Sequence, residues 1–144
     1  PCFGADSPAD LLIAGTGDFE PQLRSLANGR ETVKFLGSVA PAELSGLYRS
    51  AIALIAPSLC YEVFPMVALE AFREATPIIA RDLGPYRQIV EESGAGMLFT
   101  DDASLGAAIA TMAEKLSRGL PQEAKLGTQT AHREAVVDAP TGTP

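Results

Sequence analysis

The stretch that decides the fold is IALIAPSLCYEVFPMVALEAF, residues 52–72. It opens with a short apolar run, whose length and composition suit a strand buried on both faces of a parallel sheet. Pro65 then favours the start of a helix, because proline fixes the helical φ angle and its missing N–H is not needed in the first turn. This segment therefore predicts one strand–loop–helix unit of an α/β protein.

The same unit recurs along the chain. Other short apolar runs predict strands at residues 10–14, 33–36, 77–80 and 96–99. A helical pattern follows each strand, and these patterns begin near residues 18, 41, 65, 85 and 102. The alternation predicts an α/β fold: a Rossmann-like, doubly wound parallel sheet of about five strands with helices on both faces. Ligands of such sheets bind at the carboxyl ends of the strands.

The composition is that of one soluble globular domain. The chain has 144 residues, of which 47% are apolar, and a formal net charge of −7, which disfavours nucleic acid as a partner. The longest apolar run, residues 51–56, is far shorter than the roughly 20 residues that cross a bilayer, so we expect no transmembrane segment. Without a signal segment, we expect a cytoplasmic location. The chain begins at Pro1 rather than Met, which indicates a piece of a longer protein.

Metal ligands and reactive side chains are sparse. Cys2 and Cys60 are too few for a structural zinc site. A disulfide between them is formally possible, and free cytosolic thiols are the simpler interpretation. Cys60 has no histidine near it in the predicted fold and is interpreted as unreactive, while the single histidine, His132, is expected to be solvated. The pair Asp101 and Asp102 stands at the start of a helix and predicts capping, with Asp102 as the capping residue, rather than metal binding.

The start of the helix near residue 65 is a candidate anion site. The backbone amides of Phe64, Met66 and Val67 would point out of the helix start, where the helix dipole is positive. Glu62 precedes this point, and Glu70 lies about one and a half turns into the helix. Two carboxylates around an anion site suit a nucleoside diphosphate sugar, because they accept hydrogen bonds from its hydroxyl groups. The alternative is that both carboxylates are solvated, although the apolar neighbours of Glu70 imply that it needs a partner.

The turn Gly15-Thr16-Gly17 joins a strand to a helix, as the dinucleotide-binding fingerprint does. The third glycine of that fingerprint falls on Glu20, whose side chain would block the close approach of the helix to a pyrophosphate. A nicotinamide-dependent dehydrogenase is therefore disfavoured. Two interpretations of the turn stay open: a plain strand-to-helix connection, or a turn that lines a nucleotide pocket.

Glu62 and Glu70 match the E-x7-E motif of retaining glycosyltransferases of the GT-B fold, family 4, also called group 1 glycosyltransferases. The resemblance extends in order and spacing to LLIAGTGDFEPQL (residues 11–23), VKFLGSVAPAEL (33–44) and TPIIARDLGPYRQIVEESGAGMLF (76–99). It implies that residues 1–117 are a nucleotide-sugar donor-binding domain, one half of a GT-B fold, with the likeness covering 10–117. Residues 118–144 lack apolar periodicity and are expected to form a polar, flexible tail, or to dock onto a part of the protein outside this chain.

The resemblance implies transfer of a sugar from a nucleoside diphosphate sugar to an unknown acceptor, with retention of configuration and without a metal or other cofactor. Glu62 would be the catalytic residue, contacting sugar hydroxyls near the anomeric carbon, and Glu70 would bind the ribose hydroxyls. Leu36 and Val39 would border the nucleobase. The full set of donor-binding positions would be Glu70, Phe64, Met66, Val67, Ser58, Gly15, Gly17, Leu36 and Val39.

The chain departs from the family pattern at three positions. Val63 stands where the family usually has glycine, Gln88 where it often has glutamate, and Ala75 where a glycine ends the helix. A left-handed Ala75 would cost roughly 1 kcal/mol. These departures keep a second interpretation open, a non-catalytic or degenerate nucleotide-binding module.

The resemblance also implies parts that lie outside this chain. The family's arginine and lysine that clamp the diphosphate lie upstream of the first strand, and an N-terminal acceptor domain precedes them. We therefore expect negligible transferase activity from the chain alone, because much of the rate comes from holding both substrates in register. A peripheral membrane location would arise only through that absent domain. A flavodoxin- or receiver-like domain is a weaker alternative, since Pro57 and Ser58 stand where a receiver has its phosphorylatable Asp.

Overall fold

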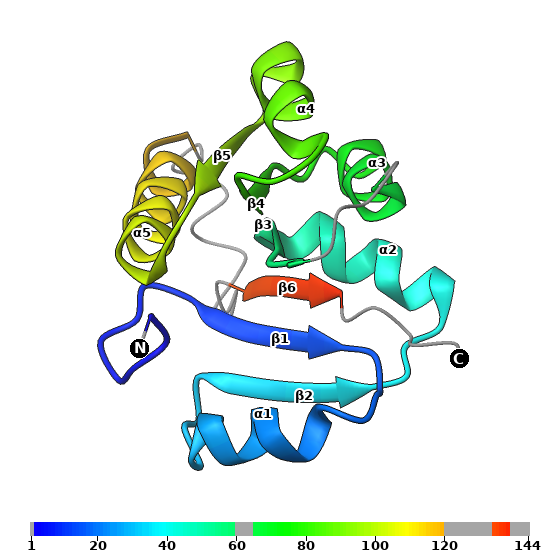
Figure 1. Cartoon of the computed structure of the whole chain (residues 1–144), viewed down its shortest axis with the longest axis vertical. Helices are drawn as coiled ribbons and strands as arrows, with labels where there is room; N and C mark the ends of the chain where they lie inside the picture. The colour runs from blue at the N-terminus through cyan, green and yellow to red at the C-terminus, as the bar shows by residue number, and fades with distance from the viewer. Residues whose placement is uncertain (1, 60–64, 120–133, 139–144) are drawn as a thin grey trace.

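The computed structural model describes residues 2–59, 65–119 and 134–138. In these ranges the strands are β1 (Asp10–Ala14), β2 (Val33–Gly37), β3 (Ala51–Ala56), β4 (Ile78–Arg81), β5 (Gly96–Phe99) and β6 (Glu134–Asp138). The helices are α1 (Glu20–Ala27), α2 (Pro41–Ser50), α3 (Met66–Arg73), α4 (Tyr86–Ser93) and α5 (Asp102–Gly119) (Figure 1). Every strand and helix expected from the sequence is present close to its predicted bounds.

The strands form one parallel sheet in the order β2-β1-β6-β3-β4-β5. β1 and then β2 lie on one side of β6, and β3, β4 and β5 follow in order on its other side (Figure 1). This is the doubly wound arrangement, so the predicted fold class is confirmed. The carboxyl ends of the strands meet at one edge of the sheet, called the carboxyl edge below.

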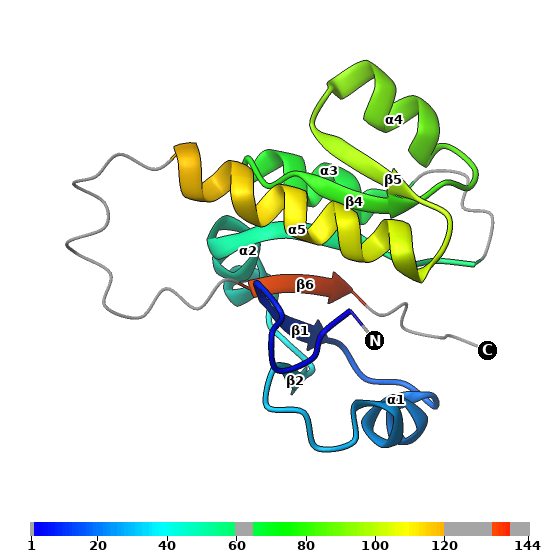
Figure 2. The ribbon, with the colours of Figure 1, turned by 90° about the vertical axis from the view of Figure 1, so that its left-hand side faces the viewer.

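β3 is buried on both faces of the sheet, which explains its uninterrupted apolar sequence. Leu54 belongs to one hydrophobic cluster, together with Tyr48 of α2 and Tyr86 of α4. Its neighbour Ile55 belongs to a second cluster, together with Ile109 of α5. Consecutive side chains therefore serve opposite faces, and Figure 2 shows α5 in front of the strands with α3 behind them.

The end of α3 has the left-handed backbone that the sequence analysis anticipated. Ala75 has a φ of 59°. Its N–H donates to the Phe72 carbonyl, and the Thr76 N–H donates to the Ala71 carbonyl, each at 2.9 Å, which is the Schellman pattern. Thr76 Oγ1 donates to the Tyr48 carbonyl at 2.5 Å and ties this turn to α2. These hydrogen bonds therefore hold Ala75 in the left-handed conformation, although its Cβ disfavours that conformation.

Ala75→Gly is expected to stabilise the protein by about 1 kcal/mol, because glycine carries no Cβ penalty at positive φ. Ala110→Gly is the matched control, since Ala110 is an exposed residue inside α5 and the same change there should cost about 1 kcal/mol. Urea denaturation of the three proteins measures both effects. If Ala75→Gly destabilised the protein as much as Ala110→Gly does, the left-handed backbone of Ala75 would not be strained.

The first turn of α5 is capped by an aspartate, as predicted, but by Asp101 rather than Asp102. The Ser104 N–H donates to Asp101 Oδ1 at 2.8 Å, and the Asp101 N–H donates to Ser104 Oγ at 3.1 Å. The bond from the Ser104 backbone is the main reason that the pKa of Asp101 lies below its usual value. In the described ranges, no three His, Cys, Asp or Glu side chains gather as metal ligands.

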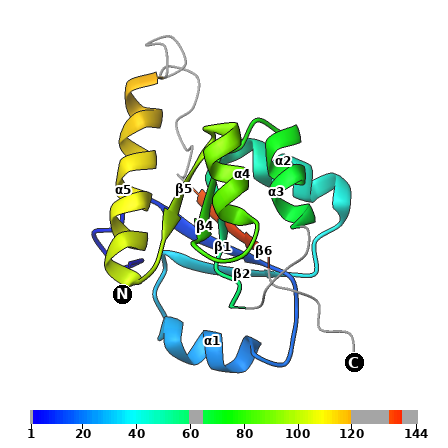
Figure 3. The same ribbon diagram turned by 45° about the horizontal axis from the view of Figure 1, so that its top comes forward.

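β6 is the element that the sequence did not predict. Residues 134–138 fall in the segment expected to be a flexible tail, yet their backbone forms a parallel strand inside the sheet (Figure 3). The tail expectation is therefore wrong for these residues. A segment of five residues is too short to show a clear apolar periodicity. Its pairing also depends on strands that lie far away in the sequence.

Candidate functional site

One side of the carboxyl edge consists of the turns after β1 and β2. Gly15 has a φ of 108° and Gly37 a φ of 67°, a backbone region that favours glycine. The Gly15 N–H donates to the Gly37 carbonyl at 2.7 Å, so the structure places Gly15 close to Leu36. Gly17 comes two residues after Gly15 on the first turn, and Val39 comes two residues after Gly37 on the second. A Cβ added at Gly17 would meet no atom within 4 Å, so this turn leaves open space.

The other side of the edge consists of the residues after β3 and the start of α3. Ser58 is half-buried two residues beyond the end of β3. Pro65 is the residue before α3 rather than its first helical residue, because its backbone is extended, with φ −79° and ψ 94°. The helix therefore begins at Met66. The predictions for five residues concern positions outside the described ranges: Cys60, Glu62, Val63, Phe64 and His132.

The first turn of α3 offers backbone donors. The Ala68 N–H donates to the Pro65 carbonyl at 3.1 Å, whereas the N–H groups of Met66 and Val67 come too early in the helix to have a helical acceptor. The helix dipole makes this end positive. The start of α3 can therefore hold an anion at the carboxyl edge.

Glu70 lies half-buried on the second turn of α3. Within the part of the chain that the structure describes, its carboxylate accepts no hydrogen bond and forms no ion pair. Glu74, one turn further on, differs: it pairs with Arg49 at 2.7 Å and accepts a hydrogen bond from Ser45 at 2.9 Å. Arg49, and then Ser45, lower the pKa of Glu74. Glu74 thus links α2 to α3, while Glu70 keeps its acceptor capacity for a ligand.

Comparison with known proteins identifies the family. Residues 4–115, more than half of the chain, match the family of glycosyl transferases group 1. The chain belongs to this family. It is 39% identical over 114 residues to a phosphatidyl-myo-inositol mannosyltransferase of Mycobacterium leprae, covering 77% of this chain and 29% of that protein.

Two further relatives support the same family. An uncharacterised glycosyltransferase of Methanocaldococcus jannaschii is 38% identical over 92 residues, which is 62% of this chain and 23% of that protein. A D-inositol 3-phosphate glycosyltransferase of Corynebacterium urealyticum is 35% identical over 101 residues, which is 65% of this chain and 24% of that protein. This group 1 glycosyltransferase chain therefore spans less than a third of each of the three relatives.

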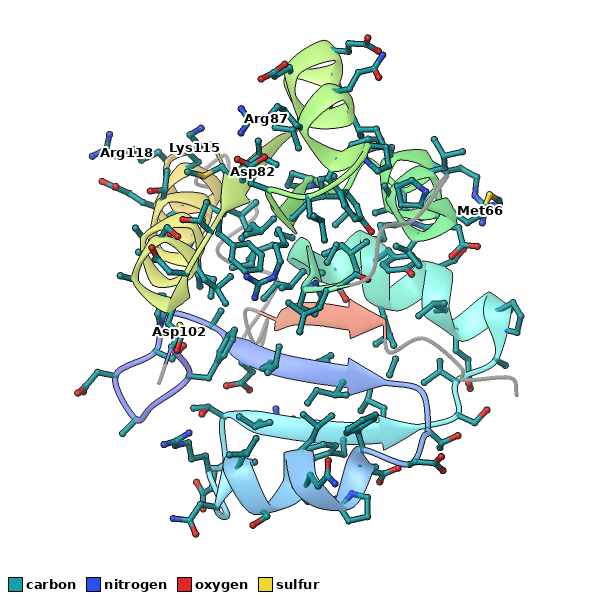
Figure 4. The ribbon with its side chains drawn as sticks, viewed as in Figure 1. Met66, Asp82, Arg87, Asp102, Lys115 and Arg118 are labelled. Atoms are coloured by element: carbon teal, nitrogen blue, oxygen red, sulfur yellow. The ribbon has the colours of Figure 1, made fainter. Side chains whose placement is uncertain are left out.

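The carboxyl edge of this glycosyltransferase domain exposes large apolar side chains. Phe19, just before α1, is 71% exposed, Leu59, after β3, is 78% exposed, and Met66, at the start of α3, is 59% exposed. In Figure 4, Met66 lies on the side toward which the arrowheads of β1 and β6 point. Apolar side chains exposed at one edge are typical of a surface that a ligand or another part of a protein covers.

Arg81 is a candidate site residue that the sequence analysis missed. It ends β4, and its Nε donates to the Pro57 carbonyl at 3.4 Å while its Nη1 donates to the Thr100 carbonyl at 3.2 Å. Its guanidinium carbon lies 4.9 Å from the centroid of the Phe99 ring. Among the described residues no carboxylate forms an ion pair with it. A cation at the carboxyl end of a predicted strand is the signal that could have identified it.

Proposed function

We propose that this domain binds the nucleoside diphosphate sugar donor of a retaining glycosyltransferase. The observation that carries the proposal is the half-buried Glu70 carboxylate, which lacks a partner among the described residues and lies one turn beyond the amides that begin α3. A carboxylate can accept hydrogen bonds from a pair of ribose hydroxyls, and N–H groups at a helix start bind phosphate. Across the edge, the open space at Gly17 would accommodate the rest of the nucleotide.

These groups would act mainly through electrostatics and orientation. The amides of Met66 and Val67, with that of Phe64, would stabilise the negative charge that develops on the leaving diphosphate, an interaction that strengthens in the transition state. Glu70 would orient the ribose. Glu62 would contact the donor sugar near its anomeric carbon, as the family resemblance implies. The proposal requires no metal or other cofactor.

The type of sugar and the need for a second domain are also proposals. Relatives named for mannosyl transfer to phosphatidyl-myo-inositol support a hexosyl donor. Because the chain spans less than a third of its relatives, we propose that transfer needs an acceptor-binding domain outside it and that the isolated chain, a cytoplasmic module, transfers no measurable sugar. None of the helices in the described ranges combines the length and apolarity needed to cross a bilayer.

Amide NMR titration of the chain with UDP, GDP and ADP tests the donor site. We expect shifts at residues 15–17, 36–39 and 66–70, larger for one base than for the other two. The base that produces them identifies the nucleotide. An absence of shifts with all three nucleotides at millimolar concentration, or shifts confined to the opposite edge of the sheet, would contradict the proposal.

Arg81→Gln is expected to weaken binding of the preferred nucleoside diphosphate by about tenfold, because a charge-assisted hydrogen bond to phosphate is lost. Binding of the corresponding nucleoside should not change, since it carries no phosphate. Arg30→Gln serves as the control, because Arg30 is exposed just before β2, at the opposite edge. Isothermal titration calorimetry measures the affinities of the wild type and the two variants for both ligands. An equal loss for nucleoside and diphosphate would mean that Arg81 only supports the Pro57 loop.

A further inference from the structure

Phe19 differs from every other aromatic side chain that the structure describes, because its ring lies in solvent. Its exposed fraction is 71%. The others are buried or half-buried: Phe3, Phe35, Tyr48, Phe72, Tyr86 and Phe99. Two of these rings, Phe35 and Phe99, also carry an arginine guanidinium on one face. Within the described ranges no cation or second ring contacts Phe19, so its aromatic face is available to a ligand.

The backbone fixes Phe19 at the carboxyl edge. Phe19 is the residue before α1, which follows β1 and begins on the side toward which the β1 arrowhead points (Figure 1). The Glu20 N–H donates to the Gly17 carbonyl at 3.0 Å, and the Leu23 N–H donates to the Phe19 carbonyl at 3.0 Å. Phe19 thus lies between a hydrogen-bonded turn and the first turn of a helix, so its ring projects from a defined backbone position.

An open space and a second exposed apolar side chain belong to the same two turns. A Cβ at Gly17 would meet no described atom within 4 Å. Leu36, near the end of β2, is 39% exposed, and the 2.7 Å bond between the Gly15 N–H and the Gly37 carbonyl holds the turns after β1 and β2 together. An exposed ring, an exposed aliphatic side chain and open space at one edge suit a flat ligand group whose faces gain by leaving water.

We propose that Phe19 stacks on the nucleobase of the donor nucleotide, an assignment that rests on the proposed function. Nucleobases are planar aromatic groups, and each of them presents a π-face that a phenyl ring can cover. Because phenylalanine has no hydrogen-bonding group in its side chain, Phe19 contributes affinity for the base without distinguishing one base from another. Arg81 and the amides that begin α3 act on the diphosphate. The two ends of the nucleotide therefore depend on different side chains.

Phe19→Ala is expected to weaken binding of the preferred nucleoside diphosphate by about tenfold, because the stacking contact is lost. The corresponding nucleoside should lose affinity by the same factor, since it contains the base, and inorganic pyrophosphate should lose none. Phe19→Trp keeps an aromatic face and should bind as the wild type does. NMR titration measures these affinities. An unchanged affinity of Phe19→Ala for the nucleoside diphosphate would overturn the proposal.

Leu26→Ala is the matched control, because Leu26 is as exposed as Phe19 and belongs to the same helix. Its exposed fraction is 72%, and it lies about 10 Å further along α1, away from the carboxyl edge. Its nucleotide affinity should equal that of the wild type, and thermal denaturation measures the stability of both variants. Equal losses of affinity in Phe19→Ala and Leu26→Ala would overturn the proposal, since the effect would then come from α1 as a whole.

Fluorescence of Phe19→Trp tests the stack directly, because the natural chain contains no tryptophan. We expect the preferred nucleoside diphosphate to quench the emission until the site is saturated, and inorganic pyrophosphate to leave the emission unchanged. Unchanged emission at a nucleotide concentration that saturates the amide shifts would overturn the stack and leave the proposed function intact. A wild-type chain without amide shifts for UDP, GDP and ADP would overturn the proposed function and the stack together.

Discussion

Glu70→Ala is expected to weaken nucleoside diphosphate binding by about tenfold to one hundredfold, while the protein stays folded. A hydrogen bond to a charged group contributes about 1.5–3 kcal/mol, which corresponds to this change in affinity. The fold should tolerate the substitution, because Glu70 has no partner among the described residues and alanine is a better helix former than glutamate. Calorimetric titration with the preferred nucleotide measures the affinity, and thermal denaturation measures the stability.

Glu31→Ala is the matched control for Glu70→Ala. It removes the same charge from an exposed position just before β2, at the edge opposite the candidate site. Its affinity for the nucleotide should equal that of the wild type. If the two variants bind equally well, Glu70 does not contact the ribose. If Glu70→Ala lowers the Tm as well as the affinity, the carboxylate has a structural role instead.

Gly96→Ala is expected to destabilise the protein by about 1–3 kcal/mol, through overpacking between β4 and β5. A Cβ at Gly96 would lie 2.7 Å from the Ile78 carbonyl oxygen, 2.9 Å from Ile78 Cγ1 and 3.1 Å from Val90 Cγ2. Ile78 is fully buried and is the register partner of Gly96, so its backbone cannot move without disturbing the strand pair. Urea denaturation measures the loss.

The same substitution at Gly46, Gly46→Ala, is expected to raise the stability of the protein rather than lower it. Gly46 is exposed inside α2, and a Cβ there would meet no atom within 4 Å. Alanine should therefore stabilise α2 by about 0.5–1 kcal/mol through its higher helix propensity. A Gly96→Ala protein as stable as Gly46→Ala would show that the β4–β5 contact is looser than the 2.7 Å approach implies.

The sequence analysis predicted five of the six strands of the described sheet because their signals are local. An apolar run such as residues 52–56 and a turn such as Gly15-Thr16-Gly17 carry their preferences within a few residues. The errors at Pro65 and Asp101 amount to one residue each, since the exact start of a helix depends on backbone angles rather than on residue type. The family resemblance relied on the same local stretches.

The candidate site was only partly predictable. Gly15 and Leu36 lie together because β1 and β2 pair in parallel. The register of that pair cannot be predicted from the sequence of either strand alone. Glu70 stood out in the sequence as a carboxylate among apolar residues. Arg81 did not stand out, because its importance comes from its contact with Pro57, which follows the neighbouring strand β3.

By itself the sequence determined the alternation of strands and helices, the doubly wound fold class, and the family to which this glycosyltransferase domain belongs. Those properties follow from local preferences and short motifs. Only the tertiary structure decided that residues 134–138 form the central strand, and hence how far apart the two halves of the carboxyl edge lie. The reason is that a short strand gains its stability from the N–H and C=O groups of its neighbours, and these come from β1 and β3, far away in the chain.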